Sequence, residues 1–226
     1  MIKRRGALGL MGGMATFVLS GCGMFGGSST YRFRMTVEVD TPQGLKTGSS
    51  VYEVWATTNN TRLLPEEHAR DWRVKGEAVA VDLGGRQFVF ALLKTGAIQG
   101  DLAGLSMTAL DPAFHNDIVE SAARIAGGDG TRARADVARK DWPMLVRFGD
   151  INDPKSVEAV DPDRIGVKRI WVETTKDDVT TGIEKRLGWL PNQQGSFVRR
   201  LSVPDPTNPP IAAILNKRDF STEIGK

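Results

Sequence analysis

Residues 31–58 read YRFRMTVEVDTPQGLKTGSSVYEVWATT, and this stretch decides the predicted fold. Apolar and polar side chains alternate from Tyr31 to Thr41, which is the period-two pattern of a strand with one buried face. Pro42 and Gly44 stand at turn positions, so the chain should reverse there. The segment Ser49–Thr58 then suits the antiparallel return strand. We therefore predict a β-hairpin at the start of the folded chain.

The rest of the chain adds strands and short helical segments to this hairpin. A second strand pair is expected at 74–83 and 86–94, on either side of a glycine pair that is typical of a tight turn. Later apolar segments predict strands at 143–148 and 167–175, and a short helix at 183–190. This order of elements predicts an α+β fold with a mostly antiparallel sheet built from hairpins, one main amphipathic helix and short helical turns.

The main helix is expected to begin at Asp111, the predicted N-cap, with Pro112 at the first helical position. Gly127 is expected to end it, because glycine readily adopts the left-handed conformation of a helix C-cap. Between them, apolar side chains recur every three or four residues: Phe114, Ile118, Ala122 and Ile125. The segment 127–139 is polar and Gly-rich, which predicts a surface loop. Its glycines at 127–130 do not indicate a phosphate-binding loop, because such loops follow a strand and open a helix, whereas these follow the predicted helix.

The first 22 residues read MIKRRGALGLMGGMATFVLSGC and have the organisation of an export signal. Basic residues at positions 3–5 precede an apolar run, Ala7–Leu19, which falls short of the ~20 residues needed to span a bilayer. The sequence Leu19-Ser20-Gly21-Cys22 resembles the lipobox of bacterial lipoproteins, in which small residues precede a lipid-modified cysteine. We expect a lipoprotein signal peptide at 1–21. A plain secretory signal and a retained membrane anchor are the alternatives.

Cys22 is the only cysteine of the chain, so no internal disulfide can form and lipid attachment would leave no free thiol for catalysis. The predicted organisation is a lipidated cysteine and flexible tether at 22–30, followed by a single soluble domain at 31–226. Lipoproteins with aspartate directly after the cysteine tend to stay in the inner membrane of two-membrane bacteria. Gly23 stands there instead, which favours the periplasmic face of the outer membrane over the inner membrane.

The charge of the chain argues against nucleic acid as a partner. There are 30 Lys and Arg against 27 Asp and Glu, but three of the basic residues lie in the predicted signal peptide. The mature chain is therefore formally neutral, and no bulk attraction to phosphate is indicated. The partners expected are the membrane, through the lipid anchor, and another protein of the envelope.

Cofactor and metal chemistry is not indicated by the residues present. The two histidines, His68 and His115, are interpreted as surface residues, and a zinc site would need more imidazole or thiolate ligands. The segment 150–154 is rich in oxygen ligands but has Pro154 where a calcium loop continues with a ligand, so a turn is favoured. We therefore expect no cofactor and no metal site.

Two patterns in the sequence bear on a hydrolase activity. The segment 104–108, GLSMT, lacks the final glycine of a nucleophile elbow, which argues against Ser106 as a nucleophile. Paired carboxylates on neighbouring strands remain an alternative, with surface charge favoured for all four: Glu38, Asp40, Glu53 and Asp82.

Trp189 offers a possible binding surface. It follows Lys185 and Arg186, and could form a partly exposed patch with Arg199 and Arg200. Packing of Trp189 in the core, beside a cluster of charges at a helix end, is the favoured alternative.

Three stretches, 31–51, 76–93 and TTGIEKRLGWL at 180–190, together resemble a group of proteobacterial proteins, often lipoproteins, that has no established activity. The resemblance implies a single folded module and brings no ligand or catalytic residue with it. The function predicted from the sequence is a lipid-anchored protein of the cell envelope that binds or scaffolds. A membrane-tethered hydrolase is the alternative.

Overall fold

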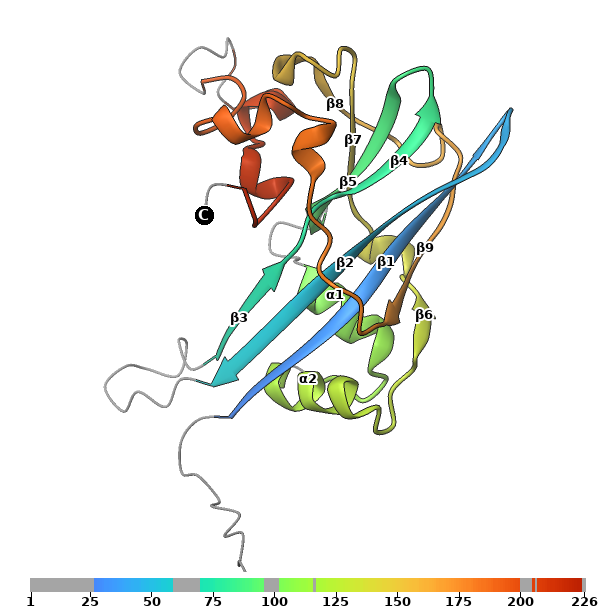
Figure 1. Ribbon diagram of the computed structural model, residues 1–226, viewed down its shortest axis with the longest axis vertical. Coiled ribbons are helices and arrows are strands. Elements are labelled where there is room, and N and C mark those ends of the chain that lie inside the picture. The colour runs from blue at the N-terminus through green and yellow to red at the C-terminus, as the bar shows by residue number, and fades with distance from the viewer. Residues whose placement is uncertain are drawn as a thin grey trace, which may run out of the picture.

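The computed structural model describes residues 27–58, 70–95, 102–115, 117–199, 205 and 207–224. Within these residues the chain forms two antiparallel sheets, two helices and several short 3₁₀ turns, as Figure 1 shows. The prediction of an α+β fold with mostly antiparallel sheets is confirmed at this level. The predicted signal peptide at 1–21 lies outside the described residues, as do Cys22, Gly23, His68 and Arg200. No helix in the described part of the chain is long and apolar enough to cross a membrane.

The first sheet contains the predicted hairpin. Its five strands lie in the order β3-β2-β1-β9-β6. Their bounds are β1 Ser28–Thr41, β2 Gly44–Thr58, β3 Arg70–Lys75, β6 Arg134–Asp136 and β9 Val167–Thr174. β1 and β2 pair without interruption from Ser28 opposite Thr57 to Thr41 opposite Gly44, so the predicted hairpin and turn are confirmed. The five alternating apolar residues of β1 are all buried: Tyr31, Phe33, Met35, Val37 and Val39.

The second sheet has four strands in the order β4-β5-β7-β8. Their bounds are β4 Val79–Gly84, β5 Gln87–Thr95, β7 Pro143–Phe148 and β8 Val157–Ala159. The predicted strand at 74–83 is divided, because Val74 belongs to β3 and pairs with β2 in the first sheet. Gly76 makes the break with a φ of 145°, and a Cβ on it would lie 2.5 Å from the ring of Tyr52. Only glycine fits this crossing between the two sheets.

The structure has two helices where the sequence predicted one main helix. They are α1 Leu102–Leu110 and α2 Ile118–Gly127. The predicted start at Asp111 is wrong, because this carboxylate accepts a hydrogen bond from the Ala113 N–H in a turn. Asp117 caps α2 instead, by accepting from the Glu120 N–H at 3.0 Å. The predicted apolar stripe is buried from Ile118 onward, and the segment expected to be a loop contains β6.

The two sheets enclose one core and a second core lies on the far side of the second sheet. Along β5, Val89 and Ala91 belong to the core shared with the first sheet and the helices. Phe90 and Leu92 belong to the second core, which is closed by the C-terminal third of the chain. β5 therefore has two buried faces and joins the two cores.

Short 3₁₀ turns make up most of the layer that closes the second core. They are η4 Ile183–Lys185, η5 Leu190–Asn192, η7 Ile211–Ala213 and η8 Lys217–Asp219, whereas η2 Arg139–Asp141 and η3 Pro154–Ser156 lie in earlier connections. Only η4 forms within the helix predicted at 183–190 before the chain turns at 188–189. The turn brings Leu190 into a buried position. The connection from β9 to this layer crosses the first sheet, where the Thr180 N–H donates to the carbonyl of Val51 at 3.1 Å.

Candidate functional site

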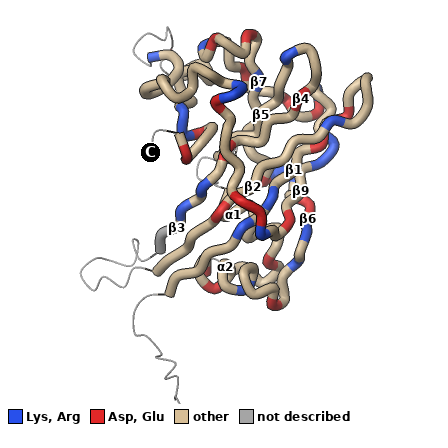
Figure 2. Tube along the Cα trace, in the orientation of Figure 1, with Lys and Arg blue, Asp and Glu red and all other residues tan. Residues whose placement is uncertain are grey.

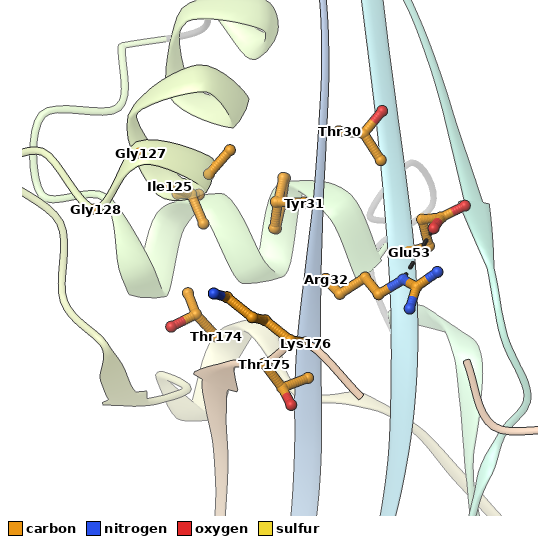
Figure 3. A pocket seen from close by; sticks show the side chains of 11 residues that line it. Thr30, Tyr31, Arg32, Glu53, Ile125, Gly127, Gly128, Thr174, Thr175 and Lys176 are labelled. Carbon is orange, nitrogen blue, oxygen red and sulfur yellow. Dashed lines mark hydrogen bonds and ion pairs between the residues drawn. The ribbon is translucent and has the colours of Figure 1, made fainter. Parts of the chain in front are cut away.

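A hollow of about 650 Å³ lies where β1 extends beyond the end of β9. Figure 3 shows it between the start of β1, the C-terminal end of α2 and the segment after β9. The pairing of β1 with β9 begins only at Phe33, and the Thr175 N–H donates to the carbonyl of Arg32 at 3.1 Å. The lining residues come from four parts of the chain: Thr30, Tyr31, Arg32, Glu53, Ile125, Ala126, Gly127, Gly128, Thr174, Thr175 and Lys176.

The walls of the hollow are fixed by local structure. Gly128 ends α2 in the left-handed conformation, with a φ of 78°, and its N–H donates to the carbonyl of Arg124 at 2.7 Å. Tyr31 is buried, and its hydroxyl lies 2.7 Å from the hydroxyl of Ser106 in α1. These contacts hold the end of α2 and the start of β1 in fixed positions around the hollow.

Two charged side chains of the hollow, Arg32 and Glu53, form an ion pair, whereas Lys176 is exposed. The Arg32 Nε donates to Glu53 at 2.9 Å, and Lys75 lies 3.2 Å from the same carboxylate. The hydrogen bond from Arg32 lowers the pKa of Glu53 below its ordinary value, so this carboxylate stays ionised. Lys176 is exposed on the opposite wall, and Figure 3 shows its ammonium group turned toward Thr174 and the end of α2. Because Arg32 is paired with Glu53 and Asp178, Lys176 is the lining cation that forms no ion pair within the described residues, and the hollow suits the binding of a polar group.

The four carboxylates considered for hydrolysis are not brought together. Glu38 is only 9% exposed, because Arg169 donates to it at 2.8 and 3.0 Å and the Trp171 Nε1 at 3.3 Å. The Arg169 hydrogen bonds lower the pKa of Glu38, with a smaller contribution from Trp171. Asp40 is exposed near the hairpin turn, and Asp82 accepts from the Gly84 N–H at 2.8 Å in the turn of the second sheet. Glu38, Glu53 and Asp82 each have a hydrogen-bond partner within the fold, and Figure 2 shows acidic and basic residues interspersed along the first sheet.

The other residues considered for chemistry occupy ordinary structural positions. Ser106 is buried within α1 and donates to the carbonyl of Ala103 at 3.0 Å. His115 is exposed, with its Nδ1 2.6 Å from the carbonyl of Ala113. Asp150 accepts from the Asn152 N–H at 2.9 Å, which confirms the predicted turn. Within the described ranges, no group of three or more His, Cys, Asp or Glu side chains is placed to hold a metal ion.

Trp189 packs in the second core, as the favoured interpretation predicts. Its Nε1 donates to the carbonyl of Ile151 at 2.9 Å. Its ring lies edge-on to Phe148 and Phe197, with centroids 5.5 and 5.2 Å away. Arg199 is exposed. Trp189 is only partly buried, and Arg200 lies outside the described residues, so the binding surface that the sequence suggested stays a prediction.

Glu77 is a buried carboxylate that the sequence did not single out. It is 2% exposed, and it accepts hydrogen bonds from the Ile183 N–H at 2.8 Å and from the Ser221 hydroxyl at 3.1 Å. Burial raises the pKa of Glu77, and the two hydrogen bonds partly offset this effect. It joins the crossing between the sheets to the C-terminal layer. A single glutamate between two strands carries no pattern from which this role could have been predicted.

Comparison with known proteins identifies no relative of this chain. The chain matches no protein-family model, and no curated protein or solved structure shows significant similarity to it. The resemblance to a group of lipoproteins therefore stays a prediction from the sequence.

Proposed function

We propose that the protein is a lipid-anchored protein of the cell envelope, attached through Cys22, whose folded part binds a partner and does not catalyse a reaction. The observation that carries the proposal is the sequence Leu19-Ser20-Gly21-Cys22 behind a basic and apolar leader. A diacylglyceryl group on Cys22, with a further acyl chain on its nitrogen, would hold the protein firmly, because each buried CH₂ contributes about 0.8 kcal/mol.

The geometry of the folded part supports binding. The hollow beside β1 offers the Lys176 ammonium and the Arg32–Glu53 pair to a polar group, whereas the Thr174 and Thr175 hydroxyls donate to Ala133 and Asp177. A carboxylate that acts as a general acid needs a raised pKa, whereas the pKa values of Glu38 and Glu53 are both lowered by their arginine partners. The partner we propose is another protein of the envelope, and the location is the periplasmic face of the outer membrane.

The anchor is tested by growing cells with a clickable palmitate and comparing the wild type with Cys22→Ala. Ser20→Ala is the matched control, because it keeps a small residue in the lipobox and leaves the cysteine in place. We expect label in the wild type and in Ser20→Ala, none in Cys22→Ala, and the labelled wild type in the outer-membrane fraction. Equal label in Cys22→Ala, or no label in any of the three, would overturn the proposed anchor.

A further inference from the structure

The folded chain starts beside two exposed tryptophans. β1 begins at Ser28, and Thr30 lies opposite Trp55 of β2. In the next row, Ser29 lies opposite Ala56, which in turn lies opposite Trp72 of β3. Neighbouring strands are ~4.8 Å apart, so the backbones of the two tryptophans lie about one and two strand spacings from β1. Figure 1 shows the start of β1, the end of β2 and β3 at the same end of the first sheet.

Both tryptophan side chains are open to solvent, at 36% exposed for Trp55 and 40% for Trp72. Trp55 lies opposite Arg73 and Trp72 opposite Ala56, so the two indoles project from opposite faces of the β2–β3 pair. β3 is an edge strand of the sheet. The two rings therefore flank one corner of the sheet.

Two basic side chains, Arg73 and Lys75, lie on the Trp55 face of this corner, and Lys75 is paired with Glu53 at 3.2 Å. The Arg73 guanidinium lies 5.5 Å from the ring centroid of Trp55. A small groove of about 210 Å³ is lined by Glu53, Trp55, Arg73 and Lys75. An aromatic ring beside cationic side chains is the combination that favours the boundary between lipid headgroups and acyl chains.

The length of the tether places this corner close to the membrane. Five Cα steps of 3.8 Å separate Cys22 from Gly27, so the chain between them spans at most ~19 Å. A lipid on Cys22 therefore keeps Ser28, and the tryptophans beside it, near the bilayer surface. Leu45, which is 52% exposed, lies at the other end of β2, ~33 Å from Trp55 at ~3.3 Å per residue.

We propose that Trp55 and Trp72, with Arg73 next to Trp72 in sequence and opposite Trp55 across the β2–β3 pair, dock the corner of the first sheet onto the phospholipid bilayer. The indole rings lie in the headgroup region, and the guanidinium lies near lipid phosphates. The inference rests on the proposed lipid anchor. The anchor supplies attachment, and the tryptophan corner fixes how the folded part is oriented on the membrane.

The test uses the full lipidated protein, purified and placed in vesicles of phosphatidylethanolamine and phosphatidylglycerol. Part of the lipid is replaced by phosphatidylcholine brominated on its acyl chains near the headgroup, which quenches nearby indoles. We expect bromolipid to quench the wild type and most of this quenching to disappear in the Trp55→Phe/Trp72→Phe double variant. Trp189→Phe should retain it, because Trp189 packs in the second core.

The matched control is a variant whose exposed tryptophan lies at the other end of the hairpin. Leu45→Trp in the double-variant background places an exposed indole at the opposite end of the hairpin, where bromolipid should leave it unquenched. Quenching that survives in the double variant, or that returns with Leu45→Trp, would overturn the docking.

Palmitate label measured on the same samples separates the two proposals. Labelled protein whose tryptophans are not quenched by bromolipid would overturn the docking and leave the anchor standing. Wild-type protein without label would overturn the anchor.

Discussion

The two cores of the molecule are built in different ways, although β5 contributes to both. The core between the sheets is mainly aliphatic and is lined by regular strands and helices. The second core contains a cluster of rings, in which Phe220 lies 6.0 Å from Phe90 and 5.7 Å from Phe197, centroid to centroid. Large rings bury much area per residue, so a layer of short turns can close a core without regular secondary structure.

The difference also extends to one carboxylate in each half. Glu38 lies on the outer face of the first sheet, and arginine stabilises its charged form. Glu77 is buried at the edge of the second core, and burial disfavours its charged form more than its hydrogen bonds from neutral donors favour it. These two groups should affect stability with opposite dependence on pH.

The largest expected effect is the loss of a ring from the second core. Phe220 is fully buried, and Phe220→Ala should lower the free energy of unfolding by ~3–5 kcal/mol, through lost burial and the cavity left behind. Phe33→Ala, in the first core, is the matched variant and should cost a similar amount. Urea unfolding followed by circular dichroism measures both.

Because β5 joins the cores, both phenylalanine variants should shift one common unfolding transition. Two separate transitions, with Phe220→Ala moving only one of them, would show that the cores fold independently. A loss below ~1 kcal/mol for Phe220→Ala would show that the C-terminal layer contributes little.

An intermediate effect is expected at Glu77. Glu77→Ala removes the acceptor for the Ile183 N–H and should cost ~1–3 kcal/mol, whereas Glu77→Gln keeps an acceptor of the same shape. Because the folded-state pKa is raised above 4.5, the folded protein holds this proton more tightly than the unfolded chain. The wild type should therefore lose stability relative to Glu77→Gln as pH rises from 4.5 through the raised pKa. Urea unfolding at a series of pH values measures the difference, and a constant difference would contradict the assignment.

The smallest effect is expected at Glu38, and its pH dependence has the opposite sign. Glu38→Gln should destabilise the protein at neutral pH by less than Glu77→Ala, because water screens the partly exposed guanidinium of Arg169. The pKa of Glu38 is lowered, so its contribution is present above 4.5 and is lost as pH falls through the folded-state pKa. The control is Asp40→Asn, an exposed carboxylate on the same strand. Equal effects of the two substitutions would show that the Arg169 pair contributes nothing.

The sequence was most informative where a strand has one buried face. The alternation in β1 predicted its end at Thr41 and its five buried apolar residues, although β1 begins at Ser28, three residues before the predicted start. The apolar runs of β7 and β9 were also found. α1 was missed because seven of its nine residues are buried, which leaves no polar face to mark a helical period. β6 and β8 are three residues each, too short to show an alternation.

The candidate site was less predictable than the fold. Its hollow depends on where β9 stops pairing with β1 and on the place where α2 ends, and neither is a property of a local pattern. The tryptophan corner similarly depends on the register that brings Trp72 level with Ser29. Composition could indicate only that charges are balanced across the chain, and the structure shows which of them are paired.

The central claim is the lipid anchor at Cys22, and the intact mass of the chain extracted from membranes tests it most directly. The account predicts a mature chain that begins at Cys22 and carries the added mass of a diacylglyceryl group, with or without a further acyl chain. A chain that retains residues 1–21, or one cut elsewhere and bearing no lipid, would contradict it.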